Sequence, residues 1–117
     1  MYKLFDSELK LMEILWNNEP INAAQLSVLA TEKIGWNKNT TYTIINKLIK
    51  KQVILRTEPG FVCSSLIKKE DVKRAETELL IKRLFDGSKL AFFAAFLENE
   101  TLSEQELSEL RALIEKK

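Results

Sequence analysis

The sequence predicts a mainly α-helical protein with one small β-hairpin, and three observations predict this fold class. Apolar residues recur at helical spacing along most of the 117 residues. Two short runs of residues that favour β-strands flank the turn signal Glu58-Pro59-Gly60. The apolar content of 45% is ordinary for a globular protein, which excludes intrinsic disorder as the main state.

Two short helices are predicted at the start of the chain. Over residues 7–18 the apolar side chains fall on one helical face, and Asp6 or Ser7 is the expected N-cap. The second helix begins at Asn22 as its N-cap and ends where Gly35 supplies a left-handed cap. Both predicted helices are short, and the sequence signals where they begin and end.

The third predicted helix, residues 39–51 after an Asn37 cap, has an unusual polar face. Its apolar side consists of Thr41, Ile44, Ile45, Leu48 and Ile49. The opposite side carries Thr, Asn and Lys, although Thr and Asn each cost roughly 0.5 kcal/mol in a helix. Short hydroxyl and amide side chains suit base edges in a DNA groove, and basic side chains suit the phosphates. The pattern favours a recognition helix over an exposed helix of poor propensity, and the expected DNA contacts are Asn39, Thr40, Tyr42, Thr43, Asn46, Lys47 and Lys50.

The net charge of +1 conceals an uneven distribution of charge. Residues 1–69 carry ten Lys or Arg and six Asp or Glu, whereas residues 70–117 carry eight and eleven. Residues 33–57 hold six basic residues and no acid, which suits a polyanionic partner. A chance run of bases on a solvated face is the alternative that composition leaves open.

A hairpin is predicted directly after the third helix. Its strands are residues 53–57 and 61–66, and Pro59 and Gly60 take the second and third positions of a type II turn. Cys63, the one cysteine, cannot form an internal disulfide and is expected to be a small strand residue rather than a reactive thiol.

Two short helices, a recognition-like helix and a hairpin together predict a winged helix-turn-helix domain over residues 1–69. The hairpin is the expected wing, and Arg56 on it is a further candidate phosphate contact.

Residues 70–117 predict a helical dimerisation domain. A helix to about residue 85 precedes the breaker Asp86-Gly87-Ser88, and residues 90–97 are apolar on every side. The last helix begins at Ser103, with Glu106 completing a capping box. We expect a second copy of the chain to cover these apolar residues. The alternative is that the helices of residues 70–117 fold back onto the first domain. The expected dimer contacts are Leu79, Leu84, Phe85, Phe92, Phe93, Phe96, Leu97, Leu107, Leu110 and Ile114.

The absences argue against an enzyme. The chain has no His, one Cys and three isolated Gly, so we expect no metal site, no cofactor and no phosphate-binding loop. The longest apolar run, residues 90–97, is too short to span a bilayer, and the N-terminus lacks a signal-peptide core. We therefore expect a cytoplasmic protein without a membrane partner.

Several stretches together match one known family. They are residues 8–16, Trp36-Asn37, Thr40, Thr43, residues 46–51 and residues 102–107. The chain thereby resembles, over almost its whole length, the penicillinase repressor family, the BlaI/MecI/CopY transcriptional repressors. The resemblance implies a dimeric winged-helix repressor on a palindromic operator, with Thr40 and Thr43 facing bases or phosphates.

Four differences from the family pattern qualify what the resemblance implies. Tyr42 stands where the family usually has Lys or Arg, so a different operator sequence is expected, and Gln52 stands where Gly usually follows the Lys pair, so a different helix end is expected. Some members have an Asn-Phe bond that a regulatory protease cuts, whereas this chain reads Ala95-Phe96. The sequence therefore supports such a protease as a partner less than it supports DNA or a second copy of the chain. The paired C-terminal cysteines of the copper-sensing members are absent.

The leading hypothesis is therefore a sequence-specific DNA-binding repressor that acts as a homodimer on a palindromic operator. Its rival is a dimeric winged-helix module that binds proteins and not DNA. Retention on a nonspecific duplex that weakens steeply with salt distinguishes the first from the second.

Overall fold

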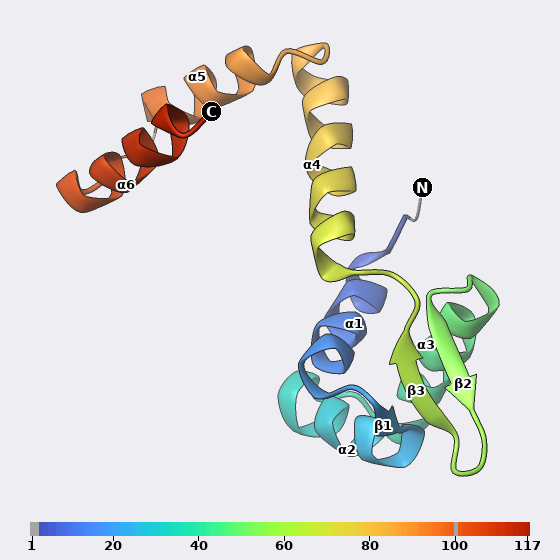
Figure 1. Ribbon diagram of the computed structural model, residues 1–117. Helices are drawn as coiled ribbons and strands as arrows, with labels where there is room; N and C mark the ends of the chain where they lie inside the picture. Colours follow the sequence, from blue (N-terminus) through green and yellow to red (C-terminus); the bar gives the residue numbers. More distant parts are fainter. Residues whose placement is uncertain (1–2, 100) are drawn as a thin grey trace. The chain divides into compact units, whose positions relative to one another are not determined.

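The computed structural model describes residues 3–99 and 101–117. Along the chain its elements follow the order α1, β1, α2, α3, β2, β3, α4, α5, α6 (Figure 1). They form two compact units, one ending at Thr77 and the other starting at Glu78, so the division falls inside α4 (Lys69–Phe85). The functional division at residue 69 stays a prediction.

The first unit packs three helices against a three-stranded antiparallel sheet. The helices are α1 (Asp6–Asn18), α2 (Ala23–Ile34) and α3 (Lys38–Lys50), and the strands are β1 (Ile21–Asn22), β2 (Ile54–Thr57) and β3 (Val62–Ser65). Strand β3 lies between β1 and β2; β3 packs on α1, and β2 packs on α3 (Figure 1). The mainly helical fold class with a small β element is confirmed.

One apolar core joins all the helices of this unit to the hairpin. Its fully buried side chains include Leu11, Met12, Leu15, Leu26, Ile45, Leu48, Val53, Ile54 and Cys63. The indole nitrogen of Trp16 donates to the carbonyl oxygen of Ile67 at 3.1 Å, and Val72 extends the core into the start of α4. The core therefore fixes α3 and the hairpin as one body.

The caps of α2 and α3 are the predicted ones, and the cap of α1 is not. The side chains of Asn22 and Asn37 accept from the main-chain nitrogens of Gln25 and Thr40, each at 2.8 Å, as N-caps do. The N-cap of α1 is Phe5, neither Asp6 nor Ser7. Phe5 has no side-chain oxygen, and instead its N–H donates to the carboxylate of Glu8 at 2.9 Å.

The end of α2 follows the predicted breaker, whereas the end of α3 differs from its expectation. Gly35 closes α2 in the left-handed region with φ 83°. After α3, Gln52 takes φ 63°, a conformation that favours glycine, and the next N–H, that of Val53, donates to the carbonyl of Leu48 at 2.9 Å. Gln52 thus takes the left-handed conformation that a glycine adopts at a helix end, and the different helix end expected there is wrong.

The prediction of a two-stranded hairpin missed a third strand, which pairs with the hairpin. Ile21 and Asn22 of β1 pair with Cys63 and Val62 of β3. The two strands of the hairpin are also shorter than predicted. Gly60 has the expected left-handed φ of 93°, but Phe61 is left-handed as well, with φ 50°, so residues 58–61 form the connection.

The second unit contains the end of α4, then α5 (Lys89–Asn99) and α6 (Glu104–Glu115). The predicted break lies at Asp86 and Gly87, both left-handed. The predicted capping box is present: Ser103 Oγ accepts from the N–H of Glu106 at 3.0 Å, and Glu106 Oε1 accepts from the N–H of Ser103 at 3.1 Å. Within residues 3–99 and 101–117, no helix has the length and apolar character of a membrane span.

Candidate nucleic-acid interface

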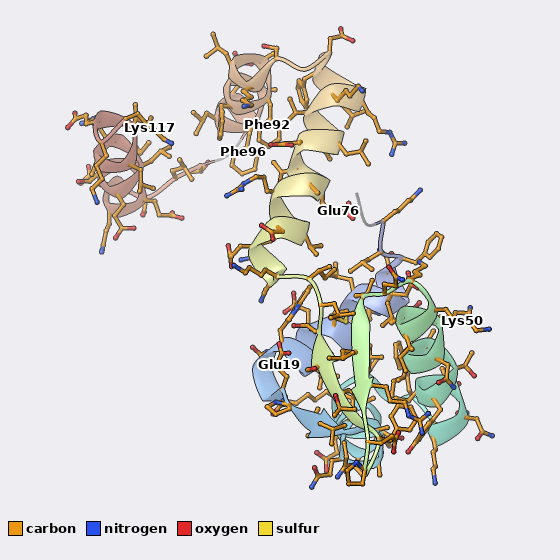
Figure 2. All side chains as sticks on the ribbon, turned by 45° about the vertical axis from the view of Figure 1, so that its right-hand side comes forward. Glu19, Lys50, Glu76, Phe92, Phe96 and Lys117 are labelled. Atoms are coloured by element: carbon orange, nitrogen blue, oxygen red, sulfur yellow. The ribbon has the colours of Figure 1, made fainter. Side chains whose placement is uncertain are left out.

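The outer face of α3 gathers seven of the eight candidate DNA contacts. Asn39, Thr40, Thr43, Asn46, Lys47 and Lys50 are exposed, and Tyr42 is half-buried. Directly opposite, Thr41, Ile44, Ile45 and Leu48 are buried in the core, as the helical spacing predicts, and Ile49 is partly buried. Figure 2 shows the Lys50 side chain extending away from the sheet.

The start of α3 is held by two side-chain hydrogen bonds, which makes the helix a rigid support for this face. The buried hydroxyl of Thr41 donates to the carbonyl of Asn37 at 3.1 Å, inside the first turn. The hydroxyl of Thr31, on α2, donates to the carbonyl of Trp36 at 2.6 Å and so fixes the loop that leads into α3. The polar side chains consequently project from a helix whose position is set by the core.

The hydroxyl of Thr43 has a defined direction. Its proton is donated to the carbonyl of Asn39 at 2.9 Å, within α3. The oxygen lone pairs and the methyl group then face outward. An acceptor next to a methyl group suits an exocyclic amine of adenine or cytosine, or the methyl group of thymine.

The acid-free segment, residues 33–57, is less positive in the folded protein than in the sequence. The ammonium of Lys51 binds the carboxylate of Glu8 at 2.8 Å, and Arg56 pairs with Glu58. Neither acid belongs to the segment, so composition alone could not reveal these pairs. Lys33, Lys38, Lys47 and Lys50 make no ion pair with any described residue.

Arg56 is held at the wing by two neighbours. Its guanidinium lies 3.6 Å from the centre of the Phe61 ring, and its Nε donates to the carboxylate of Glu58. That hydrogen bond, with the N–H of Phe61 as a second donor at 3.3 Å, holds the pKa of the Glu58 carboxyl below its usual value. Sequence reasoning missed Phe61 and Glu58, although an acid two residues after Arg56 in a turn was a usable signal.

The predicted structural role of Cys63 agrees with its surroundings. The side chain is fully buried in β3, and burial raises the pKa of the thiol, which lowers its reactivity at neutral pH. Among the residues that the structure describes, no group of three or more His, Cys, Asp and Glu could hold a metal ion.

The second unit exposes an apolar surface. Of its residues whose side chains the structure describes, only Ile81 is buried. The Phe92 ring packs edge-on against Phe85 and Phe93, with centroid distances of 5.5 and 5.3 Å. None of the ten predicted dimer contacts is buried, and Leu80, Leu90 and Leu113, which were not predicted, are exposed too.

A groove of about 320 Å³ lies between α5 and α6 on this surface. It is lined by Phe93, Phe96, Leu97, Leu102, Glu106, Glu109, Leu110 and Leu113. Phe92 and Phe96 both extend from α5 (Figure 2). The structure thus brings four predicted dimer contacts together around one apolar hollow, with two carboxylates among its lining residues.

Comparison with known proteins gives consistent results. A family model described as penicillinase repressor matches residues 4–116. The penicillinase repressor of Bacillus licheniformis is 27% identical over 97% of this chain and 90% of its own length. The methicillin resistance regulatory protein MecI of Staphylococcus aureus is 28% identical over 99% of this chain and 96% of its own.

Solved structures match part of the chain. The solution structure of the DNA-binding domain of the repressor BlaI is 28% identical, with a TM-score of 0.55, and covers 61% of this chain and 93% of that one. The monomeric form of Bacillus licheniformis BlaI, in complex with the blaP half-operator, is 26% identical, with a TM-score of 0.54, over 60% of this chain and 88% of that one.

Proposed function

This chain belongs to the penicillinase repressor family, whose members are transcriptional repressors and not enzymes, and we propose that it represses transcription as a homodimer bound to a palindromic operator. The observation that carries the proposal is the outer face of α3, where Thr, Asn and Lys side chains project without an acid over a buried apolar side. A repressor of transcription acts on DNA inside the cell, so the cytoplasm is its proposed location.

The dimensions and chemistry of α3 suit the major groove. Its 13 residues make a helix roughly 20 Å long, and the groove is about 12 Å wide. In this arrangement Thr40 and Thr43 face base edges together with Asn39 and Asn46, whereas Lys47 and Lys50 contact phosphates. The related BlaI was solved in complex with a half-operator, which supports DNA as the partner of this face.

Arg56 adds a phosphate contact from the wing. Its guanidinium is exposed on β2, beside the face of α3 that Tyr42 borders. Phosphate contacts fix the register of a protein on the duplex, and base contacts supply the sequence preference. The wing therefore adds to the phosphate contacts of Lys47 and Lys50, and the base contacts come from α3 alone.

The exposed apolar surface of the second unit supports the homodimer. Leu90 is 81% exposed, and Phe93 and Phe96 are each 52% exposed. Soluble single domains rarely leave so many large apolar side chains exposed to water in one region. A large aromatic side chain buries about 150–250 Å² when it is covered. A second copy offers the same apolar residues, and a two-fold dimer matches a palindromic site.

The proposal does not require a regulatory protease. Ala95 and Phe96 lie inside α5, where a helical backbone is a poor protease substrate, and the pair differs from the Asn-Phe bond of some family members.

Salt-dependent binding of a fluorescent mixed-sequence duplex tests the DNA partner. We expect affinity to fall steeply between 50 and 200 mM salt, by about 10³-fold if some six phosphates are contacted. Lack of binding at the lowest salt, by a chain that is folded by circular dichroism, would favour the protein-binding module instead.

A further inference from the structure

A chain of ring contacts connects the recognition helix to the wing. The Tyr42 ring of α3 packs edge-on against the Phe61 ring, with centroids 5.9 Å apart and an interplanar angle of 79°. The Phe61 ring in turn lies under the Arg56 guanidinium at 3.6 Å. Tyr42 is half-buried, unlike the exposed Thr43 beside it. Its ring therefore already has a partner within the protein.

Phe61 is fixed by its main chain as well as by its ring. Its carbonyl accepts from the N–H of Ala23 at 2.9 Å, and its N–H donates to the Glu58 carboxylate at 3.3 Å. Its φ of 50° is unfavourable for a residue with a Cβ atom, so the surrounding contacts hold it in place. Phe61 is thus a fixed platform between α3 and β2.

Arg56 depends on this platform for its position. A guanidinium is planar and permanently charged, so it stacks well on an aromatic face. Its other partner, Glu58, lies in the exposed connection of the hairpin. The ring of Phe61 consequently sets where the Arg56 charge stands relative to α3.

We propose that Tyr42 is a positioning residue that acts through Phe61 to hold Arg56 at the DNA backbone, and that it does not read a base. This inference rests on the proposed function and revises the expectation that Tyr42 itself contacts DNA. It predicts that Tyr42 and Arg56 are energetically coupled through Phe61, whose ring contacts both.

A double-mutant cycle in the full chain tests the coupling. Each phosphate contact contributes about 0.9 to the slope of log K against log salt on a mixed-sequence duplex. Arg56→Ala is expected to lower the slope by about that amount, and Tyr42→Ala to lower it by a similar amount. In the Arg56→Ala background, Tyr42→Ala should lower the slope no further. Tyr42→Phe keeps the ring and should restore the slope.

The preferred sequence gives an independent readout. Duplexes selected from a random pool by Tyr42→Ala should show the same base preferences as those selected by the unaltered chain. A changed preference at one position, or slope losses that add in the double variant, would overturn the inference. If Tyr42→Ala fails to fold, Phe61→Leu removes the same ring contact from the side of the wing. This variant should then show the loss of slope expected for Tyr42→Ala.

The protein without DNA separates failure of this inference from failure of the proposed function. The Phe61 ring current should shift the side-chain proton resonances of Arg56, and Tyr42→Ala should change that shift. If the unaltered chain binds no duplex, the proposed function fails and this inference fails with it. If the unaltered chain binds while Tyr42→Ala leaves both slope and resonances unchanged, the inference alone is wrong.

Discussion

The buried carboxylate of Glu8 binds the ammonium of Lys51 at 2.8 Å and thereby ties the start of α1 to the end of α3. The Glu8 side chain is 3% exposed and that of Lys51 is 37% exposed. The same carboxylate accepts the N–H of Phe5, and the Lys51 ammonium lies 4.8 Å from the Phe5 ring centre. Lys51 therefore stabilises the fold, whereas its neighbour Lys50 is free to contact DNA.

This relationship predicts different costs for two adjacent lysines. Lys51→Met leaves a buried carboxylate without its cation and should destabilise the protein by about 1–2 kcal/mol, an amount limited by the partial exposure of Lys51. Lys50→Met removes no ion pair and should change stability by less than about 0.5 kcal/mol. Urea unfolding measures both, and equal effects would contradict the role given to Lys51.

Lys47 and Lys50 are predicted to contact phosphates. Alanine at either position should lower the slope of log K against log salt by about 0.9, because one contact is lost. Lys10→Ala, an exposed lysine on α1, is the matched control and should leave the slope unchanged. Slopes that do not differ from that of the Lys10 variant would remove both residues from the interface.

Thr43 is predicted to read a base. Thr43→Ala should cost about 1–3 kcal/mol on the preferred duplex and spare mixed-sequence binding. Thr43→Val keeps a methyl group and loses only the hydroxyl, so it separates a methyl contact from an accepted hydrogen bond. Competition binding on both duplexes is the measurement. An equal loss on the two would mean that Thr43 only positions the backbone.

Glu58 is predicted to compete with DNA for Arg56. Since the Arg56 hydrogen bond lowers the pKa of Glu58 from its ordinary 4.5, the pair stabilises the folded state above that pH. The stabilisation is lost as pH falls through the lowered pKa. Arg56→Ala should move the NMR-measured pKa of Glu58 back toward 4.5, and Glu58→Gln should strengthen binding to any duplex. An unchanged titration in Arg56→Ala would contradict the pairing.

Local signals in the sequence were sufficient for most of the fold. Asn37 and Ser103 cap their helices because a side-chain oxygen needs only a main-chain N–H three residues ahead. The two faces of α3 follow from its spacing alone. Gly87 ends α4 because it takes a left-handed conformation with little strain.

The parts that were missed depend on contacts between distant residues. β1 has two residues, too few to show the alternation of apolar and polar side chains that marks a strand. It forms because its residues pair with Val62 and Cys63 at the edge of the hairpin. The ion pair of Glu8 could not be predicted, because its partner Lys51 lies 43 residues away. The ring contact between Tyr42 and Phe61 likewise requires the fold to bring α3 and the hairpin together.

The second unit is predicted to hold the dimer together. A chain ending at Thr77 keeps the core of the first unit and should be folded and monomeric, with weak, salt-sensitive affinity for a half-site. Phe93→Asp or Phe96→Asp in the full chain should have the same effect, because a charge is forced into an apolar contact. Sedimentation gives the mass. A dimer that persists in the shortened chain would contradict this role.

Selection of bound duplexes from a random pool by the full chain tests the central claim, a dimeric sequence-specific repressor, most directly. We predict enrichment of an inverted repeat whose half-site centres lie about 10 bp, or a multiple of that, apart, because two copies of α3 related by a two-fold axis must enter successive major grooves. Sequencing the recovered pool gives the result. A pool with no enriched motif after repeated rounds, or one with a single unrepeated site, would contradict the claim.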